Sequence, residues 1–524
     1  MTEEQDADLS QSATDRDGRN YRQPIRQLPK APKLSELPSK TAGAARMGAA
    51  LCEISVKLKV VTPILGGAAV TRTIDEVDII RVPTVRGHLR FWWRALHAHD
   101  CANQKEMFEA ETELWGRAAT EERREDWVAP RGRSAVDVRV TVLERGHEHD
   151  SGDPLRALGA YALWPARLQG GGDYGHLPRR KPGTTIFTLK LIGPSDRKTE
   201  LCNVVRAWIL FGGYGSRTRR GLGSLTVVDD VSSWLPAAAT RDELTALFAR
   251  DVFTGRGMAA QETPWLADAA LHVGAAGRNP IAAWTTALDW LKEFRQGPRG
   301  GAKGSAREPD AGGDKNRPSI SNWPEPDKAR HNSALPAGSR WAHTPRHNAD
   351  GVWPRAGFGL PMIAQYQSLS RVKRPGWRRG DKVPEFLRWN ELPTTHPNYG
   401  LEPRDACNPT KLGYELRWRS ALGEHGRLAS PLLVKALPLA NGQFVPCALW
   451  LARGLPQNAE VGLAEPVHGH AGEKRVKAAS AAPFDKLEDS PGAALFAPLR
   501  NKHTLRDAFL DWLKAQSNIT VVAP

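Results

Sequence analysis

Strand-like and helix-like patterns alternate along the first half of the chain. Alternating apolar and polar residues mark half-buried strands, and apolar residues three and four positions apart mark amphipathic helices. The predicted strands are residues 54–61, 135–143, 185–192 and 225–228, and the predicted helices are residues 84–97, with Thr84 as a cap, and residues 199–211. The order strand, helix, strand, strand, helix, strand is that of a ferredoxin-like, or split βαβ, domain.

The second half carries similar patterns, with fewer predicted strands. Residues 236–296 are predicted to be helical, most clearly from residue 280 to residue 294. The chain closes with a predicted helix at residues 504–516 and a predicted strand at residues 519–522. These elements predict a second α+β domain.

A β-hairpin is predicted around Asn441-Gly442, because this dipeptide joins two apolar runs, residues 432–437 and 444–451. Pro446 favours an edge position for the second of these strands, since proline has no N–H to donate to a neighbour. The predicted fold class is therefore α+β, with two ferredoxin-like domains, long basic loops and one glycine-rich loop.

The same patterns predict the domain boundaries. Segments with few large apolar residues and many Gly, Pro, Arg, Lys and Ser residues are typical of disorder. The predicted segments are a disordered tail at residues 1–49, an N-terminal domain at residues 50–232, and a C-terminal domain at residues 233–524 with a basic, disordered insertion at about 297–345.

The net charge of the chain indicates which kind of molecule it binds. The 524-residue chain has a formal net charge of +15, which favours an acidic partner, above all nucleic acid. The sequence has no long apolar run and no signal-peptide pattern at its start, so we expect a cytoplasmic protein without a membrane partner. The five cysteines are far apart and form no CxxC pair, so we expect no zinc site, disulfide framework or cofactor.

The richest candidate for binding is the loop between the second predicted helix and the fourth predicted strand. Glycine permits close approach of the backbone, consecutive amides can hold an anion, and arginine matches phosphate geometry. The candidate RNA-binding residues of this loop are Gly212, Gly213, Tyr214, Gly215, Arg217, Arg219, Arg220, Gly221 and Gly223. The alternative is a surface turn that is merely basic.

A second basic group lies on the predicted helix at residues 84–97. Arg86, Arg90 and Arg94 are four positions apart and share one face, so they are further candidates for RNA contact. The alternative is a solvated face whose arginines pair with glutamates at residues 109–113. Leu89, Trp92, Trp93 and Leu96 recur at helical spacing and are predicted to face the core.

The sheet of the N-terminal domain lacks the aromatic signature of RNA-recognition modules. Valines occupy the corresponding positions of one predicted strand, Val138, Val140 and Val142. We therefore do not expect RNA to bind on the sheet face in the manner of those modules.

Several motifs resemble one known family, the RAMP (repeat-associated mysterious protein) superfamily, and within it the first RAMP subunit of the type III-B CRISPR Cmr effector complex. The motifs are VTPILGG at residues 61–67, RGHLRFWWR at 86–94, LWG at 114–116, the Gly/Arg loop at 211–225, FGLP at 358–361 and RLASPLL at 427–433. The resemblance implies two ferredoxin-like domains and assembly with other Cmr subunits, guide RNA and target RNA in antiviral defence. It implies contact with the 3′ portion of the guide and no nuclease site in this subunit.

Candidates for catalysis are few. Asp75, Glu76 and Asp78 form a carboxylate cluster that can hold a metal or act as acid and base, or can simply pair with Arg72 and Arg81. The histidines near the first predicted helix, His88, His97 and His99, lack an evident orienting partner in the sequence. We predict no catalytic and no metal residues, hence a non-enzyme. The alternatives are a metal-independent endoribonuclease that processes precursor guide RNA, and a protein adaptor without RNA contact.

Overall fold

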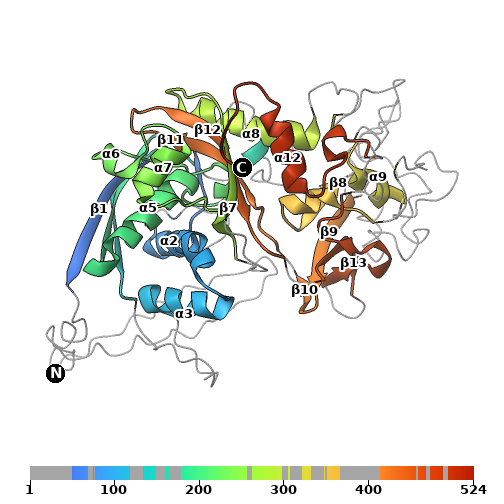
Figure 1. The fold of residues 1–524 in the computed structure, drawn as a ribbon, viewed down its shortest axis with the longest axis horizontal. Coiled ribbons are helices and arrows are strands. Elements are labelled where there is room, and N and C mark those ends of the chain that lie inside the picture. Colours follow the sequence, from blue (N-terminus) through green and yellow to red (C-terminus); the bar gives the residue numbers. More distant parts are fainter. Residues whose placement is uncertain are drawn as a thin grey trace, which may run out of the picture. The chain divides into compact units, whose positions relative to one another are not determined.

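The computed structural model shows a mixed α+β protein with antiparallel sheets, as predicted for the fold class (Figure 1). It describes residues 50–68, 75, 77–117, 134–148, 160–163, 179–255, 263–297, 305–306, 321–331, 347, 351–365, 413–425, 427–455, 458–467, 473–487 and 494–524. The predicted tail at residues 1–49 lies outside the described residues. Within the described part of the chain, no helix is long and apolar enough to cross a bilayer.

The first sheet has the strand order β3-β5-β1-β6, and every neighbouring pair is antiparallel. Its elements are β1 (Leu51–Val60), α2 (Val82–His97), α3 (Gln104–Trp115), β3 (Asp137–Arg145), β5 (Thr185–Pro194), α5 (Lys198–Phe211) and β6 (Leu225–Val227). Short elements lie beside them: β2 (Ile64–Leu65), β4 (Arg179–Arg180), η2 (Ala98–Asp100), α4 (Ala160–Leu163), η4 (Ser195–Arg197) and η5 (Thr218–Arg220). The predicted order of elements is confirmed, with α3 added.

Two local predictions for this half need correction. Helix α2 begins after Arg81 and has a proline in its first turn, so Thr84 lies inside the helix and does not cap it. The valines of β3 point to the helix-covered face, where Val138 is buried, so they do not mark the open face of the sheet. On β3 that open face carries Arg139, Thr141 and Leu143, which are also not aromatic.

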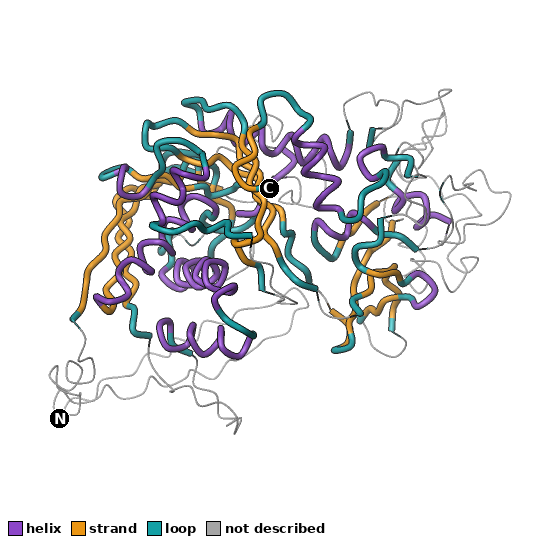
Figure 2. Tube along the Cα trace, in the orientation of Figure 1, coloured by secondary structure: helices purple, strands orange, loops and turns teal. Residues whose placement is uncertain are grey.

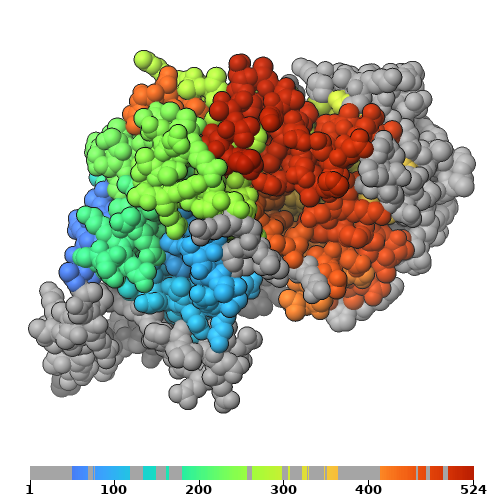
Figure 3. All heavy atoms as spheres, viewed as in Figure 1, coloured from blue at the N-terminus to red at the C-terminus, as the bar shows by residue number. Residues whose placement is uncertain are grey.

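The second sheet has the strand order β11-β12-β7-β16. Its elements are β7 (Trp265–Val273), α8 (Pro280–Gln296), β11 (Leu432–Pro438), β12 (Phe444–Ala452), α12 (Leu505–Lys514) and β16 (Thr520–Ala523). They repeat the order of the first half. Figure 3 shows α12, in red, beside the yellow-green residues near 280, and α12 packs against α8. Helices α6 (Val231–Trp234) and α7 (Arg241–Phe248) lie between the halves in sequence.

Both faces of the second sheet are covered. Helices α2 and α5 of the first half pack on one face (Figure 2), and α8 and α12 pack on the other. One hydrophobic core joins the two sheets. Every residue of β11 is buried for this reason. The two halves are therefore layered on each other, and β11 lies close to the Gly/Arg loop that follows α5.

Two predictions for the second half are wrong. Residues 265–273 form a strand, although residues 236–296 were expected to be helical, because a strand buried on both faces has a continuous apolar run without alternation. The predicted hairpin is confirmed, but β12 is a central strand. Pro446 lies between the isolated Gly277–Phe444 bridge and the first β7–β12 pair, Cys447–Val273. The ladder between β7 and β12 is interrupted there, so the strand accommodates a proline.

A third sheet, which the sequence patterns do not predict, has its own small core. Its strands are β8 (Met362–Gln365), β9 (Gly413–Ser420), β10 (Gly423–His425), β13 (Glu460–Pro466), β14 (Lys474–Val476) and β15 (Ala482–Pro483), with η7 (Pro354–Phe358), η11 (Ala478–Ser480) and η12 (Ala497–Leu499) as 3-10 turns of the same half. In sequence, these strands are inserted between α8 and α12 on either side of the β11–β12 hairpin.

The predicted insertion at 297–345 contains ordered structure. Helix α9 (Pro324–His331) lies within it, and Trp323, just before this helix, is fully buried. The Trp323 ring contacts Phe294 of α8 and Phe496 at centroid distances of 5.5 and 4.6 Å. The prediction of disorder is therefore wrong for residues 321–331, because one large aromatic side chain ties this polar segment to the core.

Candidate nucleic-acid interface

The Gly/Arg loop starts where α5 ends and folds back on the turn after β1. The Tyr214 amide donates to the Gly223 carbonyl at 2.8 Å, which closes the loop on itself. The Gly223 amide donates to Pro63 at 2.9 Å, and the Ser216 amide donates to Leu65 at 2.6 Å. The loop is therefore a fixed part of the first half, built on the residues between β1 and α2.

The glycines of this loop are required by packing inside the chain. Gly223 has φ +65°, and a Cβ there would overlap the Tyr214 carbonyl oxygen. Gly221 has φ +76°, and a Cβ there would lie 2.6 Å from the Trp284 indole nitrogen and 2.7 Å from the Val434 carbonyl oxygen. Trp284 belongs to α8 and Val434 to β11, so Gly221 lets the loop of the first half approach the second half.

Most of the loop amides already have acceptors. Hydrogen bonds to protein oxygens are donated by the amides of residues 212, 214, 216, 220, 221, 223 and 224. An amide that donates inside the chain is not available to an anion. The sequence-based idea that consecutive amides form an anion-binding concavity is therefore wrong for these amides.

Tyr214 belongs to the core. Its side chain is fully buried, and its hydroxyl accepts a hydrogen bond from the Arg81 amide at 2.9 Å. Burial raises the pKa of Tyr214 above its usual value. The side chain has no exposed surface to offer RNA, and its function is to join the loop to the start of α2.

The three loop arginines point to different acceptors. Arg217 is exposed and donates to the Ala162 carbonyl at 3.3 Å. Arg219 donates to the Ser430 carbonyl and lies 5.3 Å above the Phe91 ring. Arg220 donates to the Leu432 carbonyl at 3.1 Å, so it reaches the start of β11. Arg219 contacts Ser430, two positions before Leu432.

The Arg220 guanidinium is close to other arginines. Burial, together with repulsion from Arg295, Arg217 and Arg219, lowers the pKa of Arg220 to about 10. Burial likewise lowers the pKa of Arg219 to about 10. In the described part of the chain, Arg219, Arg220 and Arg295 have no ion-pair partner. At Arg219 and Arg220 the loop therefore carries half-buried positive charge that no carboxylate among the described residues compensates.

The arginines on α2 are in a different electrostatic state. Arg90 Nε and Arg94 Nη1 lie 2.7 and 2.6 Å from the same oxygen, Oε1 of Glu111. Glu111 is a buried residue of α3, so the two ion pairs fasten α3 to α2. Arg86 donates to the Val136 carbonyl at 3.3 Å. The sequence-based alternative, that these arginines pair with nearby glutamates, is confirmed for Arg90 and Arg94.

The carboxylate cluster before α2 is engaged locally. Asp75 accepts hydrogen bonds from the amides of Val77 and Asp78 at 3.0 and 2.9 Å and pairs with Arg81 at 3.2 Å. The hydrogen bond from the Asp78 amide is the main reason that the pKa of Asp75 lies below its usual value. Glu76 lies outside the described residues. Asp75 therefore holds the chain entering α2.

His88 is enclosed by aromatic rings. It stacks on Trp208 at a centroid distance of 6.1 Å and meets the Tyr214 ring edge-on at 6.2 Å. Burial lowers the pKa of His88 to about 4, so the imidazole is neutral near pH 7. This position suits a packing residue between α2 and α5, since a base for RNA cleavage must reach its substrate.

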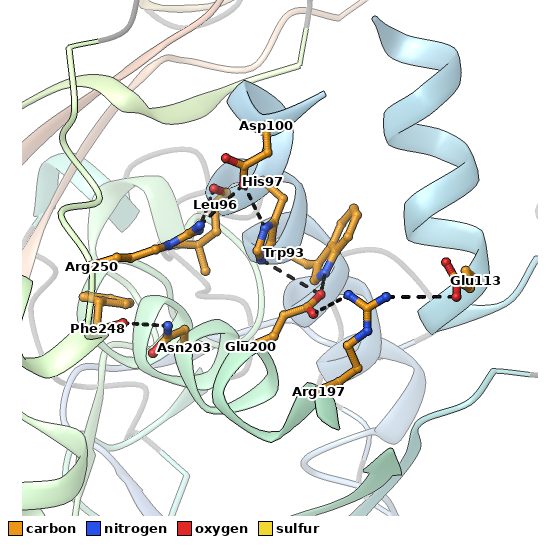
Figure 4. A network of polar contacts seen from close by, with 10 residues as sticks. All are labelled: Trp93, Leu96, His97, Asp100, Glu113, Arg197, Glu200, Asn203, Phe248 and Arg250. Carbon is orange, nitrogen blue, oxygen red and sulfur yellow. Dashed lines mark hydrogen bonds and ion pairs between the residues drawn. The ribbon is translucent and has the colours of Figure 1, made fainter. Parts of the chain in front are cut away.

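His97 belongs to a polar network between α2 and α5 (Figure 4), and His97 and His99 share the carboxylate of Asp100. His97 Nδ1 lies 3.2 Å from Asp100 Oδ2, and His99 Nε2 lies 3.1 Å from Asp100 Oδ1. On its other side, His97 lies 4.0 Å from Glu200, which accepts a hydrogen bond from Trp93 Nε1 at 2.5 Å. The network connects the end of α2 to α5.

Sequence reasoning missed one arginine near the loop. Arg453 follows β12 and donates to the Ala429 carbonyl, next to the Ser430 carbonyl that Arg219 contacts. Burial, together with repulsion from Arg219, lowers the pKa of Arg453 to about 10. Arg453 is a single basic residue in an apolar stretch, so no cluster in the sequence marks it.

Comparisons with known proteins agree with the motifs of the first half. The model of the RAMP superfamily matches residues 57–226. A search of curated proteins finds no match. The structure is similar to Cmr1 from Pyrococcus furiosus in its apo form, at 15% identity and a TM-score of 0.41, over 90% of this chain and 99% of that chain.

Two further structures are similar over part of the chain. One is a chain of the type III-B Cmr-beta complex bound to cognate target RNA and AMPPnP, at 11% identity and a TM-score of 0.35, over 76% of this chain and 94% of that chain. The other is Cmr6 from Pyrococcus furiosus, at 15% identity and a TM-score of 0.19, over 34% of this chain and 99% of that chain. The family match therefore covers the elements from β1 to β6, which include the Gly/Arg loop.

Proposed function

We propose that the protein is a non-catalytic, RNA-binding subunit of a type III-B CRISPR (Cmr) effector complex. In this function it contacts the 3′ portion of the guide RNA, the target RNA, or both, and assembles with other Cmr subunits. The observation that carries the proposal is that two loop arginines, Arg219 and Arg220, have no ion-pair partner among the described residues, within the segment that matches the RAMP superfamily. The net charge of +15 supports a polyanionic partner.

We also propose that both halves are ferredoxin-like. The order strand, helix, strand, strand, helix, strand supports this assignment, because it occurs once around the first sheet and again around the second. The third sheet is then an addition to the second unit. In this assignment, residues 50–232 and 233–524 are two units that share a core and not two separate domains.

RNA recognition in this proposal is electrostatic and acts through side chains. Arg217, Arg219 and Arg220 contact phosphates; the charges of Arg219 and Arg220 have no ion-pair partner among the described residues. The arginines on α2 contribute less, since Arg90 and Arg94 share the charge of Glu111. Base pairing with the guide supplies target specificity, and the protein reads the backbone.

The test compares two triple variants of the full chain, one with Arg217, Arg219 and Arg220 changed to alanine and one with Arg86, Arg90 and Arg94 changed to alanine. Fluorescence anisotropy with a labelled single-stranded RNA gives the affinity over a range of salt concentrations. Each lost phosphate contact reduces the salt slope by about 0.7. We expect a large reduction for the loop variant and a small one for the helix variant. An unchanged slope in a folded loop variant would remove the loop from the RNA surface.

A second experiment tests the assembly. We expect the tagged protein, purified from its host, to bring with it several RAMP subunits and RNAs of uniform length that share one repeat-derived 5′ tag. Unrelated RNA without partner subunits would contradict the proposal. Incubation of the purified chain with repeat RNA in EDTA is expected to leave the RNA intact, and cleavage would support the endoribonuclease alternative.

A further inference from the structure

Two arginines from different halves of the chain meet at one strand-like segment. Arg219 of the loop donates to the Ser430 carbonyl, and Arg453, just after β12, donates to the adjacent Ala429 carbonyl. The two residues are 234 positions apart in sequence, since 453 minus 219 is 234. Successive carbonyls of one segment therefore hold the two guanidiniums, and Arg219 lies close enough to Arg453 to repel it.

The segment that supplies these carbonyls is itself fixed. Leu428 exchanges two backbone hydrogen bonds with Leu360, at 2.8 and 2.9 Å. Gly359, at φ +111°, permits this approach, because a Cβ there would lie 2.9 Å from the Leu428 carbonyl oxygen and 2.9 Å from the Ser430 nitrogen. The positions of the two guanidiniums are thus set by the backbone of the second half.

Each guanidinium retains donors for a ligand. Arginine has five N–H groups in a planar fork, and the carbonyl contacts engage only Nη1 of Arg219 and Nη1 of Arg453. Among the described residues, each of these two guanidiniums donates only to its one carbonyl. The Phe91 ring, 5.3 Å from Arg219, restrains the plane of that guanidinium.

The local charges also favour an anion. In the described part of the chain neither Arg219 nor Arg453 has an ion-pair partner within 4.0 Å. Arg219 and Arg453 repel each other. Asp485 attracts Arg453, and burial raises the pKa of Asp485. An oxyanion between the two guanidiniums would remove this repulsion and accept hydrogen bonds from both forks.

We propose that Arg453 and Arg219 together bind one phosphate group of a single-stranded RNA, so that the RNA crosses the junction between the two halves at residues 429–430. This inference rests on the RNA-binding function proposed above and adds Arg453 to the binding residues. Because each half supplies one arginine, the site forms only when the halves are packed together. The ligand class is a phosphodiester, recognised through its charge and its paired oxygens.

The test uses full-length variants and a labelled single-stranded RNA. Arg453→Gln keeps a donor for the Ala429 carbonyl and removes the charge, and we expect an affinity about tenfold weaker, as for one charge-assisted hydrogen bond. We also expect a salt slope smaller by about 0.7. Arg453→Lys should keep the slope and weaken the affinity, since a lysine lacks the fork. The control is Arg419→Gln, whose arginine pairs with Glu460 at 2.7 Å, and it should bind RNA as the unmodified chain does.

A double-variant cycle tests whether the two arginines share one phosphate. If they do, combining Arg453→Gln with Arg219→Gln weakens binding by less than the product of the two single effects. Independent effects would overturn the shared site. If the unmodified chain binds RNA through its loop but Arg453→Gln binds equally well, this inference fails and the proposed function stands. If the unmodified chain does not bind RNA, or binds polyglutamate equally well, both fail.

Discussion

The arginines of α2 and the arginines of the Gly/Arg loop look alike in the sequence and differ in the structure. Arg90 and Arg94 lie within 2.7 Å of one buried carboxylate, that of Glu111. The hydrogen bonds of Arg219 and Arg220 in the described part of the chain go to backbone carbonyls and a serine hydroxyl. A carbonyl orients a guanidinium without neutralising it, so these two arginines keep a charge that Arg90 and Arg94 share with Glu111.

This difference shows how a basic cluster should be judged. The number of arginines is three in each group, and their spacing suggests a common face in both. The two groups differ in that Arg90 and Arg94 have an ion-pair partner, Glu111 of α3. The packing of α3 against α2 places this glutamate. The position of the compensating carboxylate decides whether a basic cluster is a binding surface or part of the fold.

The largest effect is expected on folding stability, from glycine substitutions in the Gly/Arg loop and in α2. Gly223→Ala should destabilise the chain by at least about 3 kcal/mol, because the new Cβ overlaps the Tyr214 carbonyl and the positive φ disfavours alanine. Gly87→Ala is the matched control, since a Cβ at this exposed position of α2 meets nothing within 4 Å. It should stabilise the helix by about 0.5–1 kcal/mol. Thermal melting checks both values, and equal effects would contradict the packing argument.

Glu111→Gln should convert the α2 arginines into the state of the loop arginines. Removing the buried carboxylate costs about 2 kcal/mol of folding free energy, less than for a fully buried pair because Arg90 and Arg94 are partly exposed. The freed charges should increase the salt slope of RNA binding by up to about 0.7 for each arginine. Denaturant melts and salt titrations measure the two effects. A slope that does not change would show that RNA does not reach α2.

A buried lysine offers a comparison in a third place. Lys435 of β11 donates to the carbonyls of Ile209 and Gly212, both at 2.8 Å, and so supports the start of the loop without a carboxylate. Burial lowers the pKa of Lys435 to about 7. From pH 7 to pH 9, Lys435 is therefore protonated in the unfolded chain and has lost its proton in the folded chain.

Folding stability should rise with pH in this window, by at most about 1.4 kcal/mol per unit. Burial raises the pKa of the adjacent Cys447 to about 12, so above pH 9 this thiol opposes the trend, since it ionises first in the unfolded chain. Lys435→Met should remove the rise between pH 7 and pH 9. Melting curves of both proteins over this range are the measurement, and parallel pH profiles would argue against the assignment.

The smallest effect is expected at Asp75. Asp75→Ala removes a partly exposed ion pair with Arg81 and two backbone hydrogen bonds, and the loss of folding stability should be small because water screens these contacts. Neither RNA binding nor target cleavage by an assembled complex should change. A large loss of cleavage with intact assembly would show that this carboxylate is catalytic and that the comparison of the basic clusters has overlooked an active site.

The sequence by itself determined the first half well. Alternation and helical spacing predicted the strands and both main helices of the first sheet, because this sheet has one covered face and its strands alternate. Leu89, Trp92, Trp93 and Leu96 are buried on α2 as their spacing predicted. The RAMP resemblance of this half rested on motifs that are contiguous in the chain.

Only the tertiary structure decided the rest. Strand β7 is covered on both faces, so it carries no alternation by which the sequence could show it. The glycines, the buried Tyr214 and the pairing of Arg90 and Arg94 with Glu111 depend on residues that folding brings together. Arg453 joins Arg219 through two adjacent carbonyls, although the residues are far apart in the chain. Local patterns report which face of an element is covered, whereas charge compensation and close packing depend on what covers it.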